Sequence, residues 1–238
     1  MTIAEKLQLI ARNVQKVFDG GRKAEHDEFW DVFQNYGEMT DYRNAFAFKK
    51  WNDVNFKPKY DIKISGDGTG ANMFLNSLVT NLVEDLNSLG RKFDTSGLTK
   101  ENSTFYCAYT MTHIPRIDFS NASELISTFG YCTNLEEIVE IILNSDGTTT
   151  FNDRVFYQCA KLKEVRFSGK IGQSGLTFKD CKQLSVESLR SILKALSSNG
   201  SGKSITLSTS HRAKIEADAE CTAYASAATN AGWTIAYD

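Results

Sequence analysis

A pattern of apolar positions spaced three residues apart recurs between residues 93 and 184. Each copy has a phenylalanine, a small residue, a leucine or methionine, and an isoleucine or valine. The copies are Phe105, Ala108, Met111, Ile114; Phe129, Cys132, Leu135, Ile138; Phe156, Cys159, Leu162, Val165; and a fourth, Phe178, Cys181, Leu184, in which Glu187 replaces the aliphatic residue. The phenylalanines are 24, 27 and 22 residues apart, and internal periods of this length are typical of repeat architectures.

These repeats predict a stack of turns in which each turn contributes one short strand. A second alignment supports this interpretation, because residues 93–105 (FDTSGLTKENSTF) match residues 117–129 (IDFSNASELISTF) without a gap. Strands are expected around four positions: Phe93, Ile117, Ile141 and Phe167. We expect strands of adjacent repeats to pair in parallel, roughly 4.8 Å apart. The phenylalanines and the small residues then form two ladders that point inward.

The residues after the repeats, 185–238, predict a small α/β cap. We expect a helix over 185–198, a strand in KSITLST, an alanine-rich helix over 210–230 that ends at Gly232, and a last strand in WTIAY. The last strand of a stacked sheet leaves an exposed edge that invites aggregation. We therefore expect this segment to close the C-terminal end of the stack.

Residues 38–92 are expected to form a lead-in segment that ends in an N-terminal capping helix. Scattered aromatic residues over 39–61 show no strong periodicity and predict irregular structure with short extended pieces. SGDGTG (65–70) predicts a turn, because it lacks the ending of a phosphate loop and the alternating carboxylates of a calcium loop. Leucines recur at helical spacing over 72–89, and Gly90 marks the end of this predicted helix.

Residues 1–37 predict helical structure. A heptad seam contains Ile3, Leu7, Ile10, Val14 and Val17, continued by Gly21 and Ala24. Two interpretations of the seam stay open: an amphipathic helix that packs on its own domain, or a helix that forms a homo-oligomer through residues 3–24. An aromatic stripe of Phe29, Trp30, Phe33 and Tyr36 follows on a second helical stretch, where core packing is the expected role. The predicted fold is α/β: a short solenoid with a parallel sheet, N-terminal helices and a C-terminal α/β cap.

Composition and charge narrow the class of partner. The 238 residues carry 27 basic and 29 acidic side chains, with a formal net charge of −2. There is neither a basic excess nor an acidic tail, so no nucleic-acid partner is expected. No run of about 18 apolar residues predicts membrane insertion. The first residues lack the apolar core of a signal peptide, so we expect synthesis in the cytoplasm, with association with a virion or release by lysis.

The five cysteines are expected as thiols, because an odd number fits a complete set of disulfides poorly. Cys132, Cys159 and Cys181 occupy one position of the repeat. A catalytic nucleophile has no reason to recur on every turn, so these residues are predicted to be buried and structural. Cys107 is out of register and is expected nearer the surface. No close pair of cysteines supports a zinc site.

Other candidate chemical groups are scattered along the chain. The three histidines are His26, His113 and His211. Two acidic pairs are present, Glu136 with Glu137 and Asp218 with Glu220. No histidine lies in a recognisable catalytic motif, and both acidic pairs are expected on a solvated surface. We therefore assign no catalytic, cofactor-binding or metal-binding residue, and a hydrolase with a site between the lead-in segment and the repeats stays an alternative.

Four tyrosines lie at the turns of the repeats and are the candidate binding residues. Tyr106 and Tyr157 directly follow a ladder phenylalanine, Tyr131 precedes a ladder cysteine, and Tyr109 follows the ladder alanine. Tyrosine on a rigid frame offers proteins or sugars a large contact area at low entropic cost. Two roles stay open: contact with a ligand, or shielding of the edges of the turns.

The pattern Phe-x-x-Cys-x-x-Leu-x-x-Ile at this spacing resembles the BspA-type leucine-rich repeat family, and the resemblance covers residues 93–184. It implies binding of host or surface molecules, with a protein or a surface carbohydrate as partner, and no catalysis. The start of the chain, FKPKYDI and GWTIAY also resemble small prophage-encoded proteins of gut Firmicutes. The chain departs from secreted members of the family in its few repeats and its missing signal peptide.

The function predicted from these features is non-enzymatic. We expect a binding or structural protein that acts in recognition or adhesion through the repeat face, as a component of a phage or prophage particle. The alternative is an intracellular scaffold for protein–protein interaction.

Overall fold

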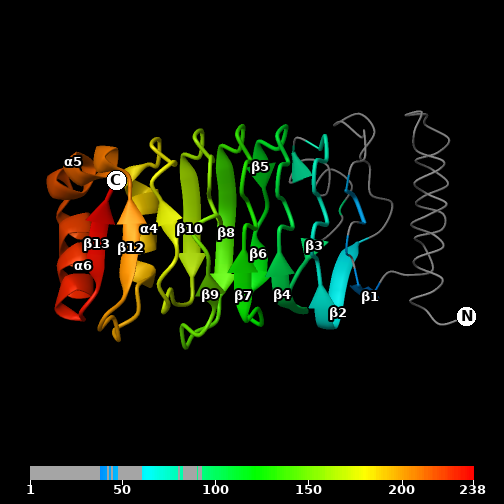
Figure 1. Ribbon diagram of the computed structural model, residues 1–238, viewed down its shortest axis with the longest axis horizontal. Helices are drawn as coiled ribbons and strands as arrows, with labels where there is room; N and C mark the ends of the chain where they lie inside the picture. The colour runs from blue at the N-terminus through cyan, green and yellow to red at the C-terminus, as the bar shows by residue number, and fades with distance from the viewer. Residues whose placement is uncertain are drawn as a thin grey trace, which may run out of the picture.

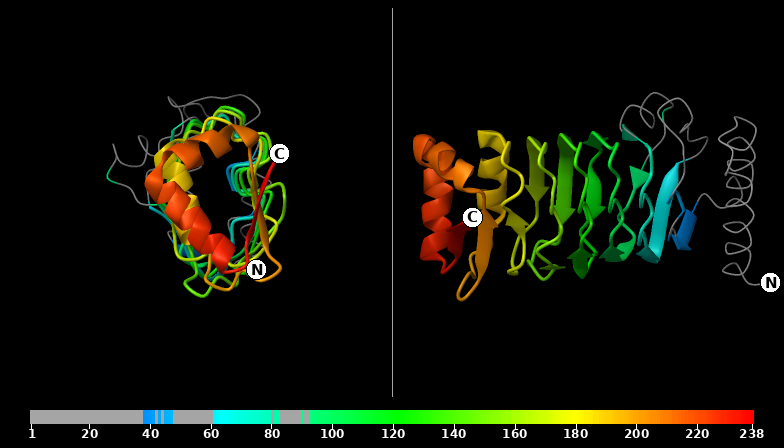
Figure 2. Two further views of the ribbon diagram at one scale, coloured as in Figure 1. Left: turned by 90° about the vertical axis from the view of Figure 1, so that its left-hand side faces the viewer. Right: turned by 45° about the horizontal axis from the view of Figure 1, so that its top comes forward.

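The computed structural model describes residues 38–41, 43, 45–47, 61–79, 81–82, 90 and 93–238. The fold is mixed α/β with several short parallel sheets. The strands lie side by side along the long axis of the molecule, and the labelled helices gather at its C-terminal end (Figures 1 and 2). Among the residues described, no helix is long and apolar enough to cross a membrane. The predicted heptad seam over 3–24, the aromatic stripe over 29–36 and residues 83–89 of the predicted capping helix lie outside this part of the chain.

Within the described part of the chain, the strands form three parallel sheets. The first contains β1 (Glu38–Asp41), β2 (Ile62–Thr69), β4 (Leu98–Asn102), β7 (Glu124–Ile126) and β9 (Thr150–Phe151) in that order, with β3 (Phe93–Asp94) beside β2. The second contains β10 (Glu164–Ser168), β8 (Glu137–Leu143) and β5 (His113–Ile114), with β6 (Ile117–Phe119) also on β8. The third contains β11 (Thr177–Phe178), β12 (Ser204–Leu207) and β13 (Thr234–Tyr237).

The predicted parallel strands are confirmed in the second sheet. Ile141 of β8 pairs with Ile117 of β6 on one side and with Phe167 of β10 on the other. The partners are 24 and 26 residues apart along the chain, so each strand comes from a successive turn. The predicted strand at Phe93 is also present, but it pairs with β2 and not with β6.

A stack of phenylalanine rings runs through the interior beside these sheets. Its members are Phe46, Phe74, Phe105, Phe129, Phe156 and Phe178, and all are buried. Neighbouring ring centroids are 4.7 to 5.5 Å apart, with interplanar angles of 27° or less. This spacing is close to the separation of paired strands, so each turn of the chain adds one ring. The stack begins before residue 93, where the sequence pattern places the first repeat.

The helix predicted over 72–89 is wrong in its first part. Residues 71–76 form turns, and Asn72 and Asn76 have φ angles of 57° and 51°, which lie far from those of an α-helix. The reason is tertiary packing, because Phe74 takes a place in the ring stack. This packing overrides the helical spacing of the leucines.

The turn predicted at 65–70 is also wrong, because β2 continues through this segment to Thr69. The register of β2 with β4 shifts between Gly68 and Thr69. Glycines within strands often mark bulges and close approach of the backbone. The glycine cluster therefore accompanies an irregular parallel strand and does not reverse the chain.

The small residues of the repeat form a second interior ladder, as predicted. Three of these residues, Cys132, Cys159 and Cys181, are free thiols with no exposed surface, and we call them the thiol ladder. Each thiol donates a hydrogen bond to the carbonyl oxygen of the phenylalanine one turn earlier, at 3.0 Å from Cys132 Sγ to Phe105 and 3.1 Å from Cys159 Sγ to Phe129. The ladder thus links successive turns through polar contacts as well as through packing.

Cys107 lies nearer the surface than the ladder cysteines, as predicted, but it is still buried, with 9% of the residue exposed against none of theirs. Its backbone N–H donates to the carbonyl oxygen of Gly130 on the next turn, at 2.8 Å. Its side chain is hydrogen-bonded with Tyr109. These two contacts hold Cys107 against the stack although it is out of the ladder register.

The predicted cap begins with α4 (Val186–Ala195), whose N-cap Ser185 accepts from the backbone N–H of Ser188. The helix lies along β10. The N–H of Val165 donates to Ser188 Oγ at 2.9 Å, and the N–H of Phe167 donates to Ser191 Oγ at 2.8 Å. Hydroxyls of a helix therefore take up strand N–H groups that would otherwise be left at a sheet edge.

The single helix predicted over 210–230 is two helices, α5 (Thr209–Ala217) and α6 (Ala219–Asn230). Asp218 between them is extended, with φ −112° and ψ 122°, and its side chain accepts from the N–H of Cys221 at 2.8 Å. Asp218 also accepts from Nε of Arg190 at 2.9 Å. Its side chain is only 17% exposed, so the expectation of a solvated carboxylate is wrong. The break has a local cause, because Asp218 caps α6 and binds α4.

Candidate functional site

Three of the four predicted tyrosines lie in a row on successive turns. The ring centroids of Tyr106 and Tyr131 are 5.5 Å apart with an interplanar angle of 86°, and those of Tyr131 and Tyr157 are 5.1 Å apart at 78°. Such edge-to-face contacts are favourable for aromatic pairs. The fourth, Tyr109, is 47% exposed. We call Tyr106, Tyr109, Tyr131 and Tyr157 the tyrosine strip.

The backbone of the turns places these rings. Two residues after Phe105, Phe129 and Phe156 the chain takes a left-handed conformation, with φ of 57° at Cys107, 62° at Tyr131 and 60° at Gln158. Tyr106 and Tyr157 come one residue before this point, and Tyr131 lies at it. A shared turn geometry therefore brings side chains from different repeat positions into one row.

Gly130 makes room for the row. A Cβ atom at this residue would lie 3.1 Å from two ring carbons of Tyr106 and 2.9 Å from the carbonyl oxygen of Arg154. The ring of Tyr106 thus lies against the next turn at the one place where that turn lacks a side chain. Tyr131, the following residue, then extends the row.

Tyr109 has an exposed apolar neighbour that the sequence patterns do not single out. Leu78 is 40% exposed and lies four residues after Phe74, as Tyr109 lies four residues after Phe105. The hydroxyl of Thr110 contacts the carbonyl oxygens on both sides of Leu78, those of Ser77 and Val79, at 3.3 Å. The helical spacing of the leucines hides this equivalence, because it places Leu78 on the inward face of a helix.

Two tyrosines of the strip, Tyr109 and Tyr131, are uncharged at physiological pH. The hydrogen bond with Cys107, followed by burial, raises the pKa of Tyr109. Burial, followed by the neighbouring Tyr157, raises the pKa of Tyr131. Because unperturbed tyrosine titrates near pH 10, both hydroxyls stay protonated and can donate as well as accept hydrogen bonds.

The thiol ladder is not poised for chemistry. Burial raises the pKa of Cys159 to about 12 and raises the pKa values of Cys132 and Cys181 well above the ordinary thiol value. The thiolate is the reactive form of cysteine, so these residues stay protonated and unreactive in the fold. Within the described residues, no cluster of three or more His, Cys, Asp or Glu side chains could hold a metal ion.

The remaining candidate groups have structural partners. Glu136 Oε2 is 3.0 Å from Lys163 Nζ, and Glu137 Oε2 is 3.6 Å from Nε2 of His113. His211 is fully buried, and its Nε2 lies 2.9 Å from the carbonyl oxygen of Cys181. Its Nδ1 accepts from the N–H of the helix cap, which assigns the proton of the neutral ring to Nε2.

No protein-family model, curated protein or solved structure matches this chain.

Proposed function

We propose that this chain is a recognition protein that binds a protein or a surface carbohydrate through the tyrosine strip and carries out no catalysis of its own. The observation that carries the proposal is the row of Tyr106, Tyr131 and Tyr157 beside the exposed Tyr109. Tyrosine is enriched where binding energy is concentrated at interfaces. Each ring of the row lies on a turn whose neighbouring phenylalanine is locked in the interior stack.

The rigidity of this frame supports binding. A ligand pays an entropic penalty for every side chain that it must order. Ring contacts within the row, and the close approach of Tyr106 to Gly130, restrict the tyrosines before any ligand arrives. The penalty is correspondingly small.

We further propose that the fold is a short solenoid of BspA-type leucine-rich repeats. The parallel strand pairs of successive turns, the ring stack and the thiol ladder support this assignment, because all three repeat with the period of the sequence pattern. The resemblance to prophage-encoded proteins supports a place in a phage or prophage particle. In that setting the predicted seam over 3–24 assembles the protein, and the tyrosine strip recognises the target.

The experiment is a binding screen with two libraries, a glycan array and a displayed peptide library. Wild type is compared with the variant Tyr106→Ser/Tyr131→Ser/Tyr157→Ser. We expect wild type to bind a defined subset of one library and the triple variant to lose at least about tenfold in affinity, as interface tyrosines do.

Val139→Ala is the matched control. Val139 is also exposed, at 40%, and lies on β8, outside the turns that contain the four tyrosines, and we expect this variant to bind like wild type. Unchanged binding by the triple variant, or equal loss in the control, would contradict the proposal.

A further inference from the structure

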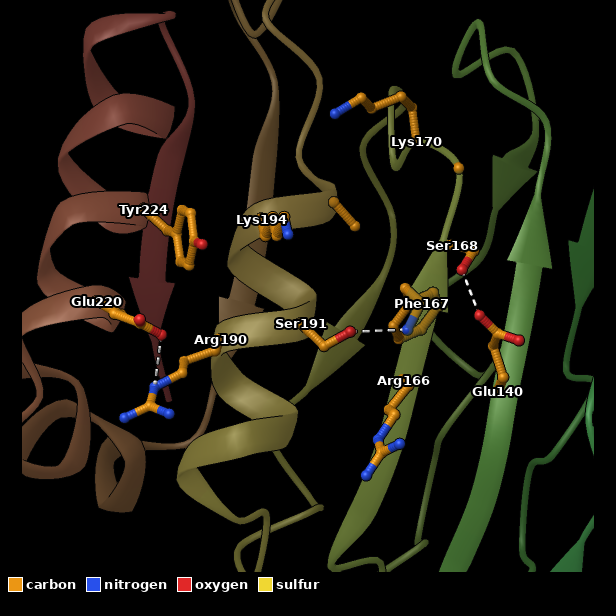
Figure 3. Close-up of a pocket in the computed structure, with 12 residues that line it drawn as sticks. Glu140, Arg166, Phe167, Ser168, Lys170, Arg190, Ser191, Lys194, Glu220 and Tyr224 are labelled. Carbon is orange, nitrogen blue, oxygen red and sulfur yellow. Dashed lines mark hydrogen bonds and ion pairs between the residues drawn. The ribbon is translucent and has the colours of Figure 1, made fainter.

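A second surface feature lies apart from the tyrosine strip, where the second sheet meets the helical cap. A groove of about 500 Å³ runs between β8 and β10 on one side and α4 and α6 on the other (Figure 3). β10 is the last strand of the second sheet on this side, and α4 packs beside it through the hydrogen bonds of Ser188 and Ser191. None of the four tyrosines of the strip lines it.

Three cations in this groove have no acidic partner among the residues that the structure describes. Arg166, Lys170 and Lys194 are exposed and form no ion pair with any residue that the structure describes. The fourth cation of the groove, Arg190, differs because Asp218 and Glu220 neutralise it. The unpaired charges are notable in a chain whose formal net charge is −2.

The acidic residues of the groove do not offset these cations. Glu140 Oε2 is 3.0 Å from Nε of Arg116, and its other oxygen accepts from Ser168 Oγ. Glu220 Oε2 is 3.3 Å from Nε of Arg190. Both carboxylates are thus already occupied, and the groove presents an excess of positive charge to a ligand.

The cations are spread along the groove. Arg166 lies on β10, which ends at Ser168, and the chain bends at Gly169, with a φ of 84°, before it reaches Lys170. Figure 3 shows these two side chains at opposite ends of one wall, with Lys194 on the helix that forms the other wall. A ligand with several separated acidic groups fits this spacing better than a single small anion.

The surface between the cations is partly polar and partly apolar. Ser168 and Ser191 line it together with Phe167, and Tyr224 of α6 lines the far side. Both serine hydroxyls are already hydrogen-bonded, Ser168 to Glu140 and Ser191 to the N–H of Phe167. Tyr224 offers a ligand an apolar ring face beside a hydroxyl, a combination that suits a sugar ring.

We propose that this groove binds an anionic carbohydrate, a sugar chain whose carboxylate or phosphate groups pair with Arg166, Lys170 and Lys194. Arginine can hold such a group through two parallel hydrogen bonds, and the lysines act as point charges. The site is separate from the tyrosine strip, so each can fail without the other.

Titration calorimetry on the full chain tests this with four probes: an oligogalacturonate, a phosphate-bearing mannan, neutral dextran and a ten-residue poly-glutamate. We expect binding of one or both acidic sugars that weakens as salt rises. Carboxylate is the recognised group if the oligogalacturonate binds, and phosphate is if the mannan binds. We expect dextran not to bind, and poly-glutamate to bind at least about tenfold more weakly than the acidic sugar.

The variant Arg166→Gln/Lys170→Gln/Lys194→Gln should lose at least about tenfold in affinity. Its matched control, Lys100→Gln/Lys182→Gln/Lys203→Gln, removes the same charge elsewhere and should lose less than about twofold, as expected for screened surface charges. Equal losses in the two variants, no binding of either acidic sugar, or poly-glutamate as the tightest ligand would each overturn the proposal. The triple tyrosine variant should bind the acidic sugar like wild type.

Discussion

Replacement of Phe129 by alanine probes the ring stack at its centre. Phe129 has no exposed surface, and its ring centroid lies 5.5 Å from that of Phe105 and 5.3 Å from that of Phe156. Truncation of a buried phenylalanine costs about 3–5 kcal/mol. Because two stacked partners lose their contacts at once, we expect a loss at the upper end of this range, about 5 kcal/mol.

The assay is urea unfolding followed by circular dichroism. With a slope of about 2–3 kcal/mol per molar urea, this loss moves the midpoint down by roughly 2 M. Tyr109→Ala is the control, because truncation of an exposed side chain should change the free energy of unfolding by no more than about 0.5 kcal/mol. If Phe129→Ala lowers the free energy of unfolding by less than about 1 kcal/mol, which is the effect of an average point mutation, the ring stack does not hold the turns together.

Four further predictions concern the cap, the buried titratable groups and the strip. Ser188→Ala removes the acceptor of the Val165 N–H of β10 and should lower the free energy of unfolding in urea by about 1–3 kcal/mol. An unchanged free energy would mean that this N–H finds another acceptor. Because burial raises the pKa of Cys159 to about 12, its contribution to stability is complete below the unfolded thiol pKa and is lost as pH rises toward 12. The free energy of unfolding of Cys159→Ala should therefore fall less than that of wild type at alkaline pH, by up to about 4 kcal/mol. An equal fall in variant and wild type would contradict this. Burial lowers the pKa of His211, so the contribution of this residue to stability is complete above the pKa of the unfolded chain and is lost as pH falls. The free energy of unfolding of His211→Gln should therefore depend less on pH than that of wild type below about pH 6.5. A stronger dependence in the variant would contradict this. Gly130→Ala should displace the ring of Tyr106 and shift its ring NMR signals, with destabilisation of about 1–3 kcal/mol from overpacking; unmoved signals would show that the glycine does not position the ring.

The interior of the repeats could be predicted from the sequence because every turn carries the same requirement. Phe129 and Phe156 contact equivalent neighbours one period apart, so the spacing of the apolar residues along the chain predicts how they pack. The same holds for Cys132 and Cys159, whose shared position in the repeat already indicates burial. Periodic packing is therefore visible in a single sequence.

The lead-in segment could not be predicted in the same way, because it contributes to the ring stack although its sequence departs from the repeat pattern. Phe74 belongs to the ring stack, but the leucines around it fall at helical spacing and serine stands where the other turns have cysteine or alanine. Asn72 and Asn76 adopt left-handed conformations, which asparagine tolerates better than most residues. Their spacing on either side of Phe74 is the signal in the sequence that indicates another turn.

The sequence predicts the tyrosine strip in part, but it does not predict the groove. The positions of Tyr106 and Tyr157 directly after the ladder phenylalanines already indicate the strip, although the row with Tyr131 depends on the left-handed turn. The groove could not be predicted, because Arg166 and Lys194 come from a strand and a helix whose contact depends on the serine hydrogen bonds to β10.

If the tyrosine strip is the recognition surface, its rings must respond to the ligand, and ring-selective NMR detects this response. Tyrosine ring signals of the full chain are followed during titration with the tightest binder from the two libraries. We expect saturable shifts in the ring signals of Tyr106, Tyr109, Tyr131 and Tyr157, while the signal of Tyr237 in the cap stays unmoved. Saturable binding that leaves all four signals in place would contradict it.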